Sequence, residues 1–152
     1  MTTPSDLPRV AVLILTWNRE DELVPCLESF VYNDHPNTTV VVIDNGSEDG
    51  TVLAVRARHP LVQVVALPAN LGFAVGNNAG LERAKGRYAV LLNTDTQVRR
   101  GALERCVAYL DAHPDAGVVG LQLLHADGRR KNSIHNFPSL LTEIVPKGLL
   151  EW

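Results

Sequence analysis

Two aspartates in this 152-residue chain each follow a run of apolar residues, and asparagines stand beside both. Asp44 follows VVVI and precedes Asn45 and Gly46, while Asp95 ends the run VLLNTD, in which Asn93 lies two residues earlier. A carboxylate beside buried sequence costs free energy unless it is ligated or hydrogen-bonded, so we expect partners for both. Asp and Asn are also ordinary turn and cap residues, so position alone leaves a structural role open.

Further polar and aromatic residues have the same setting. They follow two other apolar runs: Thr16, Trp17 and Asn18 after the first, and Asn70, Gly72 and Asn77 after VVAL. An aromatic face can stack on a base, a carboxylate can accept a hydrogen bond from a base N–H, and amides can bind ribose and phosphate. The combination suits a nucleotide.

The elements that must position these residues alternate between strands and helices. Continuous apolar runs predict strands at 10–16, 40–43, 62–67, 88–92 and 118–124. Apolar residues at helical spacing predict helices from Asp21, from Asp49 to Arg58, up to about Lys85, and over 103–110. This order predicts an α/β fold with a mostly parallel sheet, whose ligands belong at the carboxyl ends of the strands.

Local signals set the expected ends of these elements. Ser47 is placed to cap the second helix, Gly86 to terminate the third, and Asp127-Gly128 to form a hairpin turn. The spacing of Gly72, Gly76 and Gly80 is explained by close helix packing or a turn. It is not a dinucleotide fingerprint, because it does not follow the first strand.

Composition narrows the function classes. A net charge of −3 at pH 7 argues against a nucleic-acid-binding surface, and the short basic group at 129–131 reads as a solvated turn. Cys26 and Cys106 are expected to be buried free thiols, which predicts a reducing cytoplasm. No apolar run approaches the roughly 18 residues of a spanning helix. The histidines lack metal-ligand spacing: His35, His59, His113, His125 and His135.

Five motifs, in order and spacing, resemble a known enzyme family. They are LTWNRED, VVVIDNGSEDGT, LPANLGFAVGNNAGLERAKGRY, VLLNTDTQV and LDAHPDAGVVGLQLLHADG. The chain from Val10 to Gly128 is similar to the N-terminal half of the family 2 inverting glycosyltransferases, which have the GT-A fold, and most of all to the rhamnosyltransferase-like branch. The resemblance implies binding of a UDP- or dTDP-sugar for polysaccharide or glycoconjugate synthesis.

The resemblance also implies roles for single residues. Trp17 would pack beside the base, with the backbone around Thr16 and Asn18 touching it, and Asp44 would accept a hydrogen bond from the N3–H of uracil or thymine. Asn45 and Gly46 fall in the same donor-binding loop. The NLGFAVGNN stretch would serve the base and ribose, with Asn70, Gly72 and Asn77 as candidates.

The family's DxD motif falls on Asn93-Thr94-Asp95. The resemblance implies that Asp95 ligates Mg²⁺ or Mn²⁺, which binds both phosphates of the donor, since such ions are held by few protein groups and the substrate. Asn93 replaces the first acid of the motif. It keeps a ribose hydrogen bond but removes a negative charge, which predicts a weaker metal site.

The expected organisation is a flexible N-terminus at 1–8, a donor-binding domain at 9–130 and a helical extension at 131–152. The family's catalytic base lies beyond the DxD motif, and the acids after Gly128, Glu143 and Glu151, do not resemble its context. We therefore assign no catalytic base. A fragment, a truncated gene and a natural donor-binding module all explain this, and an acceptor saccharide or lipid-linked saccharide would be the partner of an intact enzyme.

Two other functions compete with donor binding. A non-catalytic interaction module would self-associate or bind a partner through residues 137–152. A nucleotidyltransferase or dinucleotide enzyme is disfavoured, because the loop after the first strand lacks glycines that let a backbone approach phosphate. Localisation is expected in the cytoplasm, with peripheral association at the inner face of the membrane as an option.

Overall fold

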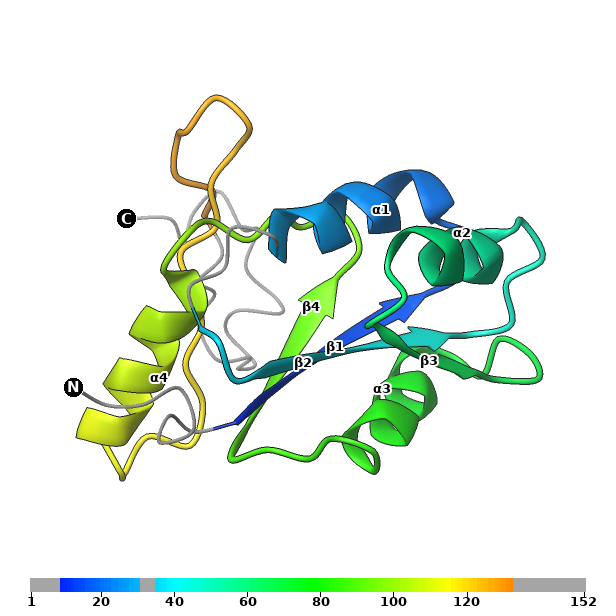
Figure 1. Ribbon diagram of the computed structural model, residues 1–152. Helices are drawn as coiled ribbons and strands as arrows, with labels where there is room; N and C mark the ends of the chain where they lie inside the picture. Colours follow the sequence, from blue (N-terminus) through cyan, green and yellow to red (C-terminus); the bar gives the residue numbers. More distant parts are fainter. Residues whose placement is uncertain (1–8, 31–34, 133–152) are drawn as a thin grey trace, which may run out of the picture. The chain divides into compact units, whose positions relative to one another are not determined.

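A computed structural model describes residues 9–30 and 35–132 of the chain (Figure 1). Strands and helices alternate along these residues. The strands are β1 (Val10–Thr16), β2 (Thr38–Asp44), β3 (Gln63–Ala66) and β4 (Tyr88–Asn93), and the helices are α1 (Glu20–Ser29), α2 (Thr51–Arg58), α3 (Phe73–Leu81) and α4 (Ala102–Ala112). The predicted α/β architecture is confirmed.

The four strands form one sheet in the order β3-β2-β1-β4, and every neighbouring pair is parallel. β1 therefore lies inside the sheet. β2 and then β3 are added on one side of it, and β4 pairs with its other side. All strands consequently end at the same edge. The loops that follow β1, β2, β3 and β4 meet there.

Alternation along β1 divides the core between the two faces of the sheet. Val10, Val12 and Ile14 point to one face, where they pack with buried residues of α1, α2 and α4. Leu13 points to the other face, together with Val41 and Ile43 of β2. Helix α3 covers that second face over β1 and β2. The continuous apolar runs of β1 and β2 are therefore explained by burial on both sides.

Helix α3 approaches the sheet closely because two of its residues have no side chain. A Cβ built on Gly76 would lie 2.5 Å from Leu15 Cδ1, and one on Gly80 would lie 2.7 Å from Ile43 Cδ1. Gly72 precedes the helix with φ 83°, a positive φ that favours glycine. Close packing and a turn, both expected from the sequence, each explain part of the glycine spacing.

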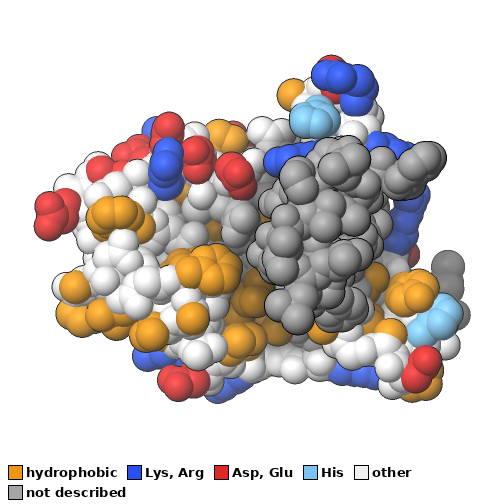
Figure 2. All heavy atoms as spheres, turned by 180° about the vertical axis from the view of Figure 1, so that it is seen from behind, with side chains coloured by type: hydrophobic (Ala, Val, Ile, Leu, Met, Phe, Trp, Pro, Cys, Tyr) orange, Lys and Arg blue, Asp and Glu red, His pale blue; other side chains and the backbone are white. Residues whose placement is uncertain are grey.

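Among the described helices, α3 covers the second face over β1 and β2, and no contact of α3 with β4 matches those in extent. Residues of β4 alternate between half-buried and exposed, and Leu91 is 52% exposed. Helix α3 adds exposed apolar side chains at Phe73, Val75 and Leu81. Apolar side chains gather at the surface on the face seen in Figure 2, below acidic side chains along the upper edge.

The predicted strand at 118–124 is wrong. Its residues are mostly exposed, and they pair with the described chain only at an isolated antiparallel bridge between Leu124 and Arg130. An apolar run becomes a strand only where another strand completes its hydrogen bonds. The turn between these two residues is confirmed: Gly128 has φ 85°, and His125 N donates to Arg129 O at 2.8 Å.

Two helix ends also differ from the prediction. Helix α2 begins at Thr51, not Asp49, because Asp49 Oδ1 instead accepts a hydrogen bond from Thr51 N at 2.9 Å. Its N-cap is Gly50, with no side-chain cap, so the expected cap at Ser47 is wrong. Helix α3 ends at Leu81, before Lys85, because Arg83 N and Ala84 N donate to carbonyls three residues earlier. Gly86 lets the backbone approach Arg9 O.

The chain divides into two compact units, residues 1–119 and 120–152. The sheet and all the helices named above belong to the first. The helical extension expected at 131–152 lies, from residue 133 on, outside the described residues, as does His135. Across the described part of the chain, no helix is long and apolar enough to cross a bilayer.

Candidate functional site

The strand register brings the predicted site residues to one edge of the sheet. Thr16 at the end of β1 pairs with Asp44 at the end of β2, and Leu15 pairs with Asn93 at the end of β4. Parallel strands lie about 4.8 Å apart, which places the ends of β2 and β4 about 10 Å from each other across β1. The predicted convergence of strand ends is confirmed.

Asp44 is buried at this edge, with only 3% of its surface exposed. Its carboxylate accepts a hydrogen bond from Ser47 N, at 3.1 Å to Oδ1 and 3.3 Å to Oδ2. The expected partner therefore exists. An ionised carboxylate offers about four acceptor sites, so one backbone N–H leaves capacity for a ligand donor.

The neighbouring Asn45 ties the loop after β2 to the loop after β3. Its Nδ2 donates to Asn70 Oδ1 at 2.9 Å and to Gly72 O at 3.4 Å, while its Oδ1 accepts from Leu71 N at 2.9 Å. Gly46 completes the junction: its φ is 80°, and an added Cβ would lie 2.7 Å from the backbone of Ala69. The amides of Asn45 and Asn70 thus hold the loops together.

A second pair of hydrogen bonds joins the loop after β1 to the loop after β2. Asn18 has a left-handed φ of 52°, its N donates to Ser47 Oγ at 2.8 Å, and its Oδ1 accepts from Glu48 N at 2.8 Å. Trp17 beside it is 51% exposed. The two hydrogen bonds of Asn18 hold this loop in place, and the exposed ring of Trp17 could stack on a flat ligand.

Asn77 takes a different position from the other predicted residues. It lies in α3, is 6% exposed, and its Nδ2 donates to Phe73 O one turn earlier at 2.9 Å. The structure thus gives Asn77 a partner inside its own helix, whereas the other candidates stand on loops or strand ends.

Asp95 lies on an exposed turn directly after β4. Thr96 Oγ1 donates to its Oδ1 at 3.4 Å, and its negative charge reaches the thiol of Cys26 in α1. Burial, reinforced by that charge, raises the pKa of Cys26 to about 12. Asp95 therefore follows the strand next to β1, on the turn directly after β4.

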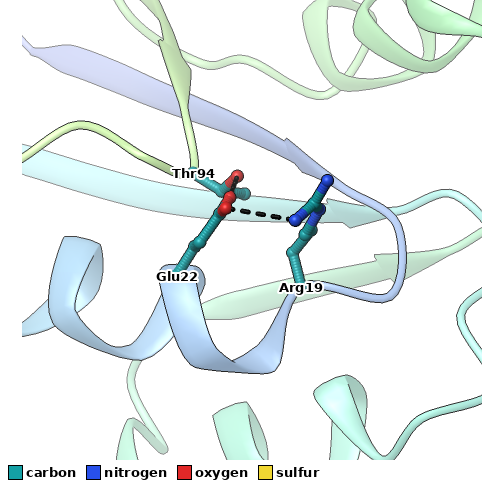
Figure 3. Close-up of polar contacts among 3 residues, drawn as sticks. All are labelled: Arg19, Glu22 and Thr94. Atoms are coloured by element: carbon teal, nitrogen blue, oxygen red, sulfur yellow. Dashed lines mark hydrogen bonds and ion pairs between the residues drawn. The ribbon is translucent and has the colours of Figure 1, made fainter.

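Helix α1 supports this turn through Glu22, a residue that sequence reasoning missed. Glu22 Oε2 accepts a hydrogen bond from Thr94 Oγ1 at 3.1 Å, and Glu22 Oε1 pairs with Arg19 Nη1 at 3.2 Å (Figure 3). Glu22 comes from the first turn of α1 and Thr94 from the loop after β4. The contact joins residues 72 positions apart, and no local spacing signals it.

The carboxylate of Asp95 can be tested against the ligands that a divalent cation needs. No group of three or more His, Cys, Asp or Glu side chains that could hold a metal occurs in residues 9–30 and 35–132. Mg²⁺ is commonly bound by one or two carboxylates together with substrate phosphates and waters. The single exposed carboxylate of Asp95 fits a cation held jointly with a diphosphate, and it does not fit a metal held by protein side chains alone.

A shallow hollow of about 600 Å³ runs along α1, and Asp49 before α2 and Arg58 at the end of α2 also line it. Its lining includes four carboxylates and one guanidinium: Glu20, Asp21, Glu28, Asp49 and Arg58. Neither Asp44 nor Asp95 lines it. Asp44 and Asp95 are placed near each other by the strand register, because β2 and β4 both pair with β1. The hollow is a separate feature, lined mainly by residues of α1.

The chain is similar to known glycosyltransferases over most of its length. The model of the family described as Glycosyl transferase family 2 matches residues 11–149. The chain is 30% identical over 146 residues to the N-acetylglucosaminyl-diphospho-decaprenol L-rhamnosyltransferase of Mycobacterium tuberculosis, covering 89% of this chain and 47% of that protein. Against three other curated relatives, it spans 55%, 36% and 50% of their length.

Two solved structures share the fold. One is the mannosyltransferase PcManGT from Pyrobaculum calidifontis in complex with GDP-Man and Mn²⁺, with a TM-score of 0.63 and 30% identity over 72% of this chain and 34% of that one. The other is S. aureus TarS 1–349 in complex with UDP-GlcNAc, with a TM-score of 0.65 and 28% identity over 70% of this chain and 32% of that one.

Proposed function

The chain belongs to glycosyl transferase family 2 and has the N-terminal half of the GT-A fold, and we propose that it binds a nucleoside-diphosphate sugar at the carboxyl edge of its sheet. The observation that carries this proposal is the register, which sets Asp44 and the Asn93–Asp95 turn on either side of β1. A nucleotide lying across β1 would meet one acid with its base and the other with its diphosphate.

The base side of the proposed site is formed by the loops after β1 and β2. Asp44 would accept a hydrogen bond from a base N–H, and the exposed ring of Trp17 would lie beside the base. The hydrogen bonds of Asn18 and Asn45 hold these loops before a ligand arrives, which reduces the ordering cost of binding. Asn70, Gly72 and Asn77 would shape the ribose side.

The diphosphate side is formed by the turn after β4. Asp95 would hold Mg²⁺ or Mn²⁺ together with the donor's phosphates, and Asn93 would bind the ribose. A bound cation of this kind neutralises charge on a departing nucleoside diphosphate. The solved relative with GDP-Man and Mn²⁺ supports the same assignment here.

We propose UDP or dTDP as the nucleotide, and inverting glycosyl transfer in polysaccharide or glycoconjugate synthesis as the activity of the intact enzyme. The solved relatives with UDP-GlcNAc and with GDP-Man make uracil and guanine the two bases to compare first. Because the chain spans about half the length of the relatives or less, donor binding is the part of the activity proposed for these residues themselves.

Calorimetric titration tests the proposal. UDP, dTDP and GDP would each be titrated into the chain with and without Mn²⁺, using wild type, Asp95→Ala and the control Asp115→Ala, which removes an exposed acid elsewhere. We expect Mn²⁺ to strengthen binding of one nucleotide, Asp95→Ala to abolish that gain, and Asp115→Ala to keep it. Equal affinity with and without Mn²⁺ in the wild type would refute the metal-dependent site.

A further inference from the structure

One side of α1 faces the turn that carries Asp95. Glu22, Cys26 and Ser29 are spaced i, i+4 and i+7, which puts them on one face of the helix. Each has a polar contact with the segment 93–98. Glu22 Oε2 accepts from Thr94 Oγ1 at 3.1 Å, Cys26 Sγ lies 3.8 Å from Asn93 O, and Ser29 Oγ accepts from Val98 N at 3.0 Å.

These contacts bracket Asp95 along the chain. Thr94 lies immediately before it and Val98 three residues after it, so α1 fixes the segment on both sides. The contacts differ in strength. A hydrogen bond to a carboxylate is worth roughly twice a neutral one, and a thiol is a weak donor, so Glu22 is the strongest of the three attachments.

Glu22 also ties this turn to the loop after β1. Its second oxygen, Oε1, pairs with Arg19 Nη1 at 3.2 Å, and the Glu22 side chain is only 33% exposed. Arg19 follows Asn18, which is held by Ser47 and Glu48. A continuous chain of contacts therefore runs from the loop after β2, through the loop after β1 and Glu22, to Thr94.

We propose that Glu22 is a positioning residue for the divalent cation: through Thr94 it fixes the turn from which Asp95 would ligate the metal. The inference rests on the proposed function, because it concerns the metal-dependent part of donor binding. Removing the attachment would leave Asp95 present but its turn less fixed, so the cation would bind more weakly while the base side is unaffected.

Four single variants and the double variant Glu22→Ala/Thr94→Val separate this role from a general structural one. Thr94→Val removes the hydroxyl and keeps the shape, Glu22→Ala removes the carboxylate, and Glu22→Gln keeps an acceptor for Thr94 without the charge. Glu28→Ala is the matched control, since Glu28 is an exposed acid of the same helix. UDP and GDP would be titrated into each with and without Mn²⁺, and the midpoint of thermal unfolding measured alongside.

We expect Thr94→Val and Glu22→Ala to lower the Mn²⁺-dependent affinity about tenfold, the low end for residues that orient metal ligands. The affinity without Mn²⁺ should not change. The double variant should lose little more than either single one, because both remove the same contact. Glu22→Gln should recover about half of the loss, since a neutral acceptor makes roughly half as strong a hydrogen bond, and Glu28→Ala should match wild type.

Hydrogen exchange without nucleotide or metal gives a second measurement. The amide of Thr96 should exchange faster in Glu22→Ala than in wild type. Unchanged exchange, unchanged Mn²⁺-dependent affinity, or an equal loss with and without Mn²⁺ would each overturn the role of Glu22 while leaving donor binding intact. A wild-type chain that ignores Mn²⁺ would instead overturn the proposed metal site, and this inference with it.

Discussion

Asp44 differs from Asp95 because it is buried and because a backbone donor, Ser47 N, approaches both of its oxygens. Such a group is held in a fixed orientation before a ligand arrives. A hydrogen bond from a base N–H to a charged acceptor contributes about 1.5–3 kcal/mol. Asp44 is therefore the residue on which recognition of the base should depend most.

Replacing Asp44 with Asn tests this at the scale of one residue. Asn keeps the size and one acceptor oxygen for Ser47 N, but its NH₂ group would face the donor N–H of a uracil or thymine base. We expect UDP affinity to fall about tenfold or more with and without Mn²⁺, consistent with loss of a charged hydrogen bond. Calorimetry measures the loss, with Asp115→Asn as control, and an unchanged affinity would place the base elsewhere.

The sequence predicts that Asp44 and Asp95 lie at strand ends, because each follows an apolar run within a few residues of the chain. It does not predict that Asn45, Asn70 and Asn18 bond to other loops, because each bond joins segments 25 to 30 residues apart. The contact of Glu22 with Thr94 cannot be predicted for the same reason, since 72 positions separate the two residues. Helical spacing puts it in the first turn of α1, but only the strand order brings β4 beside β1.

Among the elements, α3 depends on the absence of side chains where it meets the sheet. A Cβ at Gly80 would lie 2.7 Å from Ile43 Cδ1 and 3.0 Å from Ile43 Cγ1, and Ile43 is fully buried. Alanine favours a helix over glycine by about 1 kcal/mol, but overpacking a tight core costs about 1–3 kcal/mol. Because Ile43 has little space to move into, the packing cost should exceed the helix gain.

We therefore expect Gly80→Ala to reduce the free energy of unfolding by about 1 kcal/mol. Urea unfolding of both chains measures the difference. Gly117→Ala is the control, because a Cβ there would meet nothing within 4 Å. A Gly80→Ala chain more stable than wild type would mean that the sheet yields and that helix propensity dominates.

The sequence predicts strands correctly where burial on both faces requires a continuous apolar run, as in β1 and β2. It fails where contacts with distant residues determine the structure. The run at 118–124 is as apolar as a strand, yet within residues 9–30 and 35–132 it pairs only through the bridge between Leu124 and Arg130. Ser47 reads as a helix cap, but its hydroxyl accepts from Asn18 N. No neighbouring strand of the described sheet pairs along 118–124, and Ser47 is bound to another loop, so tertiary contacts overrode local propensity in both places.

At the scale of the molecule, every predicted donor-binding residue belongs to the unit 1–119. The core of that unit includes Leu103 and Val107 of α4, so its last helix is part of what holds the sheet. The unit should therefore keep its sheet, and the proposed nucleotide site, without residues 120–152.

Two truncations test this independence. A chain ending at Val119 should unfold cooperatively and bind UDP or GDP with Mn²⁺ within a few-fold of the full chain. A chain ending at Arg100 loses α4, and removal of two buried apolar side chains at about 1.5–3 kcal/mol each should prevent stable folding. Circular dichroism and calorimetry compare them, and loss of cooperative unfolding in the chain ending at Val119 would show that the later residues complete the fold.

The junction built by Asn45 has a chemical consequence over time. Asn45 is followed by Gly46, and at an Asn-Gly pair the backbone nitrogen of the glycine can attack the side-chain amide carbon with release of ammonia, after which water opens the ring to a carboxylate. After that conversion, a carboxylate oxygen would replace Nδ2. It would face Asn70 Oδ1 and Gly72 O, the two oxygens to which Nδ2 now donates. Mutual repulsion would then spread the loops after β2 and β3, so an aged preparation would lose the junction without any change in chain length.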